Sequence, residues 1–103
     1  MSPSGPTAGS PTATTVMIDA DSSGALRWVQ PRAVAKAGPV RVTLRNRSAV
    51  AHDVHLFGGG VDAATPMIQE GSASVAVALE SGTYRYVCEV PGHDSMTGTL
   101  TVE

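Results

Sequence analysis

One cysteine, one histidine and one methionine lie close together near the C-terminal end of this chain. The stretch is Cys88-Glu89-Val90-Pro91-Gly92-His93-Asp94-Ser95-Met96, and Cys88 is the only cysteine among 103 residues. A soft thiolate with an imidazole and a weak thioether suits a Cu(I)/Cu(II) couple, whereas structural zinc sites use further cysteines or histidines and no methionine. The stretch therefore predicts copper. A mononuclear electron-transfer copper site also needs a second histidine, which must come from a distant segment.

Two histidines remain as candidates for that second ligand, His52 and His55. Residues 52–57 are expected to be extended, so alternate side chains point to opposite faces. His52 then shares a face with Val54 and Leu56, which have the apolar character of a core-facing side. His55 lies on the other face. This alternation of side chains therefore favours His52 as the ligand and makes His55 a surface or sheet-face histidine.

The composition favours strands and turns over helices. Hydrophobic residues make up 42% of the chain and charged residues only 16%, with many Val, Thr, Gly and Ala. This length accommodates one domain with a real core. The formal charge of −2 provides no basic face for a phosphate backbone, which argues against nucleic-acid binding. A single cysteine excludes an internal disulfide, so stability must come from the core and the metal.

Residues 1–13 differ in composition from the rest of the chain. After Met1 they contain only Pro, Gly, Ser, Thr and Ala, which cannot bury enough apolar surface to offset the entropy of ordering. We expect a flexible tether over 1–13, of the kind that joins a domain to a membrane anchor or signal sequence, and one folded domain over 14–103.

From Thr14 onward, short apolar stretches are interrupted by Gly, Pro, Asn and Ser, and none keeps a 3.6-residue period over three turns. About eight short strands predict an all-β Greek-key sandwich or barrel. Residues 58–60 are expected to form a glycine loop, and residues 62–66 a short helical turn. Strands are expected around Val16 and Ile18, at 26–29, around Val34, and at 40–45, 53–57, 75–79, 83–88 and 98–102.

The strand pattern and the spacing of the candidate ligands resemble the cupredoxin family of plastocyanins, azurins, amicyanins and their bacterial relatives. The resemblance covers about residues 24–103, and its motifs are Asn46 before His52-Asp53-Val54, then residues 86–93 and 96–102. It implies one copper ion with His52, Cys88 and His93 as trigonal ligands and Met96 as the long axial ligand. Strong donors held by strands would keep a similar geometry in both oxidation states, while the axial donor tunes the potential. Asn46 is expected to stabilise the loop that leads to His52.

Two features depart from the family pattern. The Cys88-to-His93 spacing is azurin-like, while the short His93-to-Met96 spacing is amicyanin-like. If Met96 did not reach the metal, the carbonyl of Ala51 could act as a weak oxygen donor. Asp53 stands where plastocyanins have asparagine, and an ionised carboxylate accepts hydrogen bonds but cannot donate them.

The predicted function is one-electron transfer without an organic substrate or catalytic residues. Copper nitrite reductases and multicopper oxidases need further histidines, and only His55 remains. A cysteine-histidine hydrolase would need an orienting partner and an oxyanion donor, which the sequence does not indicate. The alternative is a copper-binding module for delivery, storage or sensing, which would use the same residues. Delivery sites, however, favour open Met- or Cys-rich coordination that exchanges metal readily.

Electrons are expected to leave through His93, with transient redox partners docking on Pro91, Gly92, Val50 and Ala51. Asp94, beside His93, would favour a cationic partner or raise the proton affinity of His93. We expect a monomer. The family resemblance places it in the bacterial periplasm or at the cell surface.

Overall fold

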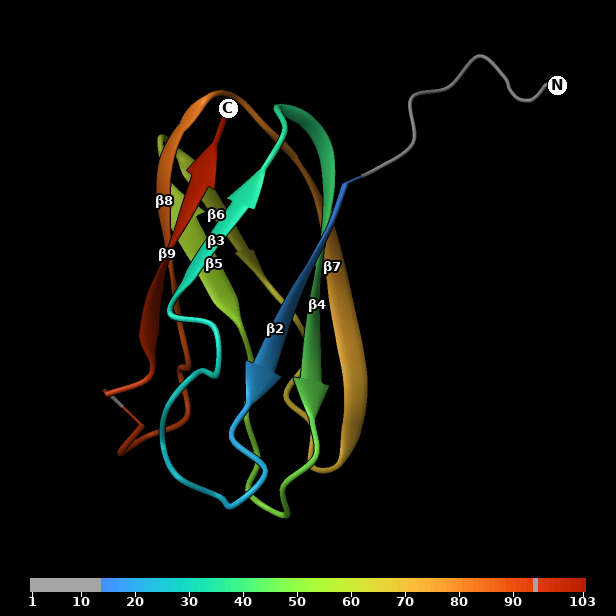
Figure 1. Ribbon diagram of the computed structural model, residues 1–103, viewed down its shortest axis with the longest axis vertical. Helices are drawn as coiled ribbons and strands as arrows, with labels where there is room; N and C mark the ends of the chain where they lie inside the picture. Colours follow the sequence, from blue (N-terminus) through green and yellow to red (C-terminus); the bar gives the residue numbers. More distant parts are fainter. Residues whose placement is uncertain (1–13, 94) are drawn as a thin grey trace, which may run out of the picture.

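The computed structural model describes residues 14–93 and 95–103, and these residues form eight strands in two sheets (Figure 1). The proposed tether over 1–13 and the role predicted for Asp94 lie outside the described residues. No helix within the described ranges is long and apolar enough to cross a membrane. The strands are β2 (Thr14–Ala20), β3 (Arg32–Ala35), β4 (Gly38–Asn46), β5 (His55–Gly58), β6 (Val61–Ala64), β7 (Gly71–Leu79), β8 (Gly82–Val87) and β9 (Thr97–Val102).

The two sheets face each other as the layers of a sandwich (Figure 1). One sheet has the order β2-β4-β7, and the other has the order β3-β9-β8-β5-β6. β2 pairs in parallel with β4, and β3 in parallel with β9, while the remaining pairs are antiparallel. Consecutive strands β2, β3 and β4 therefore alternate between the sheets. The predicted all-β Greek-key sandwich is confirmed.

The core lies between the sheets and follows the alternation of the strand sequences. Val40, Val42 and Leu44 of β4 are all buried, as the two-residue period predicts. Leu56 and Leu100 of the other sheet are also buried. Each such side chain contributes about 1.5–3 kcal/mol when fully buried, so the core can support this domain without a disulfide.

The prediction of a strand over residues 26–29 is wrong. Only Trp28 pairs there, through an isolated bridge to Ala20. The cause is a tight turn after β2, in which the Asp21 carboxylate accepts a 2.9 Å hydrogen bond from the Ser23 amide and Gly24 adopts a φ of 88°. The chain then crosses the end of the sandwich, and the buried Trp28 side chain anchors it.

The prediction of a helical turn over residues 62–66 is also wrong, because residues 61–64 form β6. Gly59 and Gly60 have φ values of 52° and 84°. Two successive positive φ angles are what a tight hairpin turn needs, so the chain folds straight back along β5. The glycine run is therefore a short turn between two strands, and its first residue, Gly58, still belongs to β5.

Candidate metal centre

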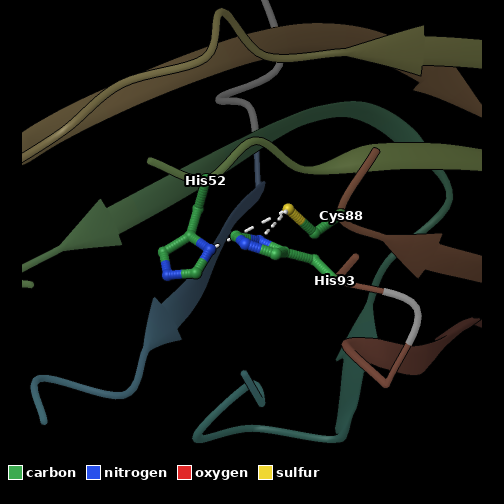
Figure 2. A group of neighbouring side chains, drawn as sticks. All are labelled: His52, Cys88 and His93. Carbon is green, nitrogen blue, oxygen red and sulfur yellow. Dashed lines mark hydrogen bonds between the residues drawn. The ribbon is translucent and has the colours of Figure 1, made fainter. Parts of the chain in front are cut away.

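Three potential ligand side chains converge at the end of the sandwich that lies away from the C-terminus (Figures 1 and 2). His52 lies between β4 and β5, Cys88 directly follows β8, and His93 lies in the loop between β8 and β9. Cys88 Sγ is 3.9 Å from His52 Nδ1 and 3.5 Å from His93 Nδ1. One donor atom from each residue lies within 4.8 Å of the others. Both imidazoles therefore present the same ring nitrogen, Nδ1, to the sulfur (Figure 2).

The structure buries His52 and leaves His55 partly exposed, as the strand alternation predicted. His52 has an exposed fraction of 0%, and Val54 and Leu56 are buried on the same side. His55 is partly exposed and lies on the opposite face of β5. The backbone of His52 is fixed by a reciprocal bridge to Ile68, with N–O distances of 3.0 and 2.9 Å. The ring also packs edge-on against Trp28, with centroids 6.3 Å apart.

The loop that contains His93 is closed by three backbone hydrogen bonds. The Cys88 amide donates to the Met96 carbonyl at 3.2 Å, the Met96 amide to the His93 carbonyl at 3.0 Å, and the His93 amide to the Val90 carbonyl at 3.0 Å. Met96 is fully buried. The short return from His93 thus brings Met96 back beside Cys88, within the interior.

Asn46 supports the His52 loop, as predicted. Its amide nitrogen donates to the carbonyls of Val50 (2.8 Å) and Ile68 (2.9 Å), and its oxygen accepts from the amide (3.0 Å) and hydroxyl (2.8 Å) of Ser48. Asn46 and Ser48 are both buried. One side chain therefore joins the end of β4 to both segments that flank His52.

Asp53 connects the two segments that carry ligands. Its carboxylate accepts a 2.7 Å hydrogen bond from the backbone amide of Glu89, the residue after Cys88. This interaction needs only an acceptor, so the replacement of the plastocyanin-type asparagine by aspartate does not remove it.

The electrostatics of the site suit a bound cation. Burial raises the pKa of the Cys88 thiol, so the sulfur needs a nearby positive charge to become a thiolate. Burial, and then the proximity of His93, lower the pKa of His52. A neutral His52 keeps a lone pair available for a metal.

The donor geometry fits a first-row metal ion. Metal–sulfur bonds of about 2.3 Å and metal–nitrogen bonds of about 2.0 Å, at angles between tetrahedral and trigonal, place sulfur and nitrogen roughly 3.5–3.7 Å apart. The two separations in the structure, 3.5 and 3.9 Å, lie within about 0.2 Å of that range. One thiol and two imidazoles, with the buried Met96 joined through its backbone to Cys88, provide the donor types that copper prefers.

Sequence reasoning missed several residues that support the site. Thr65 is buried, and its hydroxyl accepts a 3.0 Å hydrogen bond from the Val54 amide, while its own amide donates to the Val54 carbonyl. Ile68 bridges His52, and Trp28 packs on the His52 ring. The sequence could not indicate these contacts with the His52 segment, because each joins residues that are distant along the chain.

A sequence model described as copper binding proteins of the plastocyanin/azurin family matches residues 14–103. The chain belongs to this family. The predicted resemblance is therefore confirmed, and the cofactor of this cupredoxin is copper. A search of curated protein sequences gave no match.

Several solved structures share the fold of this cupredoxin. Auracyanin A, a "blue" copper protein from the green thermophilic photosynthetic bacterium Chloroflexus aurantiacus, has 25% identity and a TM-score of 0.79, with 89% of this chain and 100% of that chain covered. Auracyanin B has 28% identity, a TM-score of 0.77 and 93% of both chains covered. A reduced mutant of amicyanin has 28% identity and a TM-score of 0.67, with 90% of this chain and 86% of that chain covered.

Proposed function

We propose that this cupredoxin is a one-electron carrier with a single type 1 copper site. His52, Cys88 and His93 would hold the ion as its strong donors, and Met96 would supply a weaker thioether donor. The observation that carries the proposal is the convergence of two Nδ1 atoms on one buried sulfur. When bound, copper supplies the Cu(I)/Cu(II) couple.

The role of the protein is to hold the ligands still. His52 is fixed by its bridge to Ile68, and the ends of the Cys88–Met96 loop are joined by a backbone hydrogen bond. The Asp53–Glu89 bond ties the two ligand segments together. Ligands held in this way need little rearrangement when the oxidation state changes, which favours rapid electron exchange. A buried, closed site of this kind would also release copper slowly, which argues against delivery, storage or sensing.

Electrons are proposed to enter and leave at His93. His52 is completely covered, whereas His93 keeps an exposed fraction of 9%. Pro91 and Gly92 beside it are exposed, and Val50 and Ala51 are half-buried. These small and apolar residues suit brief docking of a redox protein. No catalytic residue and no organic substrate are proposed.

We infer that the folded domain comprises residues 14–103 and that residues 1–13 tether it. Support comes from the composition of that segment and from β2, which begins at Thr14. The proposed setting is the bacterial periplasm or cell surface, where a monomer on a tether could meet its partners and where membrane attachment would act through the N-terminal side. Size-exclusion chromatography of the 14–103 fragment tests both the domain limits and the monomeric state.

Ligand variants test the function. His93→Ala should abolish the intense blue sulfur-to-copper absorption band and the reversible voltammetric wave, while His55→Ala should retain both. Met96→Leu, which nearly conserves side-chain volume, should keep the blue band and raise the reduction potential, because a weak donor to Cu(II) is lost. An unchanged spectrum and wave in His93→Ala would refute the ligand set, and loss of copper in His55→Ala would mean that the other histidine binds the metal.

A further inference from the structure

His55 joins two carboxylates on the outer face of the five-stranded sheet. Its Nδ1 lies 2.8 Å from Glu89 Oε2, and its Nε2 contacts Asp62 Oδ1. Asp62 is in β6, and Glu89 follows β8, so the ring connects elements on both sides of β5. Only an imidazolium donates from both nitrogens at once. The geometry therefore selects the protonated, positively charged ring.

Glu89 connects this ion pair to the metal centre. It directly follows Cys88, and its backbone amide donates to Asp53, the residue after His52. Glu89 is thus held at two points, through its amide by Asp53 and through its carboxylate by His55. Movement of Glu89 would move Cys88, because consecutive Cα atoms are separated by a fixed distance of about 3.8 Å.

We propose that His55 is a positioning residue for the Cys88 ligand, and that its positive charge also raises the reduction potential of the copper site. This inference rests on the proposed electron-transfer function. His55 fixes the start of the ligand loop from outside the core, through Glu89. It also offsets part of the negative charge that surrounds the loop.

The charged groups around His55 determine the sign of the effect. Asp62 faces it from β6 and Glu89 from the end of β8, while Asp53 lies two residues earlier on its own segment. The nearest cation of β8 is Arg85, which lies opposite Phe57 and donates to the Thr97 hydroxyl at 2.7 Å. Loss of the His55 proton leaves the carboxylates of Asp62 and Glu89 without their positively charged partner. The added negative charge favours Cu(II) over Cu(I), so the potential should fall as pH rises.

The pH range follows from the same contacts. Partial burial disfavours the charged ring, but the bonds and charges of Asp62 and Glu89 outweigh it and raise the pKa of His55 above its ordinary value of 6.5. The step in potential is therefore expected above pH 6.5. For a unit charge about 10 Å from a redox ion in a partly solvated setting, Coulomb's law gives about a two- to fivefold change in the Cu(II)/Cu(I) equilibrium. At 59 mV per tenfold change for one electron, this is about 20–40 mV.

The decisive experiment compares the pH profiles of two variants that each remove one positive charge. His55→Gln should keep the blue band and the reversible wave but lose the wild-type step of about 20–40 mV. Arg85→Gln removes a cation from the same sheet face without touching Glu89, so it should retain the step. In metal-free protein, an NMR titration should place the His55 pKa above 6.5 in the wild type and lower it in Glu89→Gln.

The outcomes separate this inference from the proposed function. A blue, reversible His55→Gln protein with the wild-type pH profile would overturn the inference and leave electron transfer standing. Absence of a blue site in the wild type would instead refute the proposed function, and the NMR titration would still test the His55–Glu89 link. If His55→Gln does not fold, Glu89→Gln replaces it in voltammetry: a step moved to lower pH supports the inference, and an unmoved step overturns it.

Discussion

Replacement of Asn46 by alanine should both destabilise the domain and loosen His52, the proposed copper ligand. The change removes four hydrogen bonds with lengths of 2.8–3.0 Å. The two carbonyls involved keep other donors, since Val50 O still accepts from the Ser48 hydroxyl and Ile68 O from the His52 amide. The Ser48 amide, in contrast, loses its acceptor in a buried position.

These contacts set the magnitude. Four hydrogen bonds at a net value of about 1 kcal/mol each predict a loss of roughly 3–4 kcal/mol in the free energy of unfolding, since the retained partners of the carbonyls limit the penalty. Total stability for a domain of this kind is about 5–15 kcal/mol, so the loss is a large fraction. At about 4–8 °C per kcal/mol, it should lower Tm by roughly 12–32 °C. Because Asn46 orders the loop before His52, copper affinity should also fall, by about 10–100-fold as for other groups that orient ligands.

Urea unfolding of the metal-free protein measures the first effect, and competition with a chelator for copper measures the second. Arg47→Ala, an exposed neighbour, serves as the control and should stay within about 0.5 kcal/mol of the wild type. Asn46→Asp keeps the acceptor for Ser48 but places a carboxylate against two carbonyls, so it should be no more stable than Asn46→Ala. A loss below about 1 kcal/mol in Asn46→Ala would refute the reasoning, because it would show that the four bonds contribute little in this loop.

Two further predictions concern Tyr86 in the core. A Cβ added at Gly98 would lie 2.3 Å from the Tyr86 ring, so Gly98→Ala should lower the unfolding free energy by about 2–3 kcal/mol in urea titrations, whereas the exposed Thr101→Ala should change it by less than about 0.5 kcal/mol. Burial raises the pKa of Tyr86 from 10.0 to about 12. The unfolded chain therefore loses this proton first, and stability should fall between pH 10 and 12 in the wild type but much less steeply in Tyr86→Phe.

The sequence was most informative where chemistry and periodicity agree. The types and spacing of Cys88, His93 and Met96 indicated copper because few metals use that donor set. The apolar character of Val54 and Leu56 predicted the inward face of their strand and so placed His52 inside and His55 outside, and the structure buries both apolar residues together with His52. Both inferences depend on local pattern alone, which a single sequence contains.

Prediction failed where a tertiary contact overrides local preference. Residues 26–29 have the side chains of a strand, yet the preceding turn and the burial of Trp28 make them a crossing segment with one bridge. Residues 61–64 form a strand because the Gly59-Gly60 turn supplies a partner in β5. The contacts of Thr65 with Val54 and of Ile68 with His52 could not be predicted either, since the sequence alone does not indicate which segments will be neighbours.

Asp53 shows how a departure from a family pattern can be absorbed by the surrounding structure. Its partner is a backbone amide, so a carboxylate accepts the bond as well as an asparagine oxygen would. Its charge, however, adds to those of Glu89 and Asp62 near the same loop, and together they favour Cu(II). His55 is placed between Glu89 and Asp62 and supplies a compensating positive charge. The aspartate and the histidine are therefore best understood as a pair, in which one ties the ligand segments together and the other limits the electrostatic consequence for the copper.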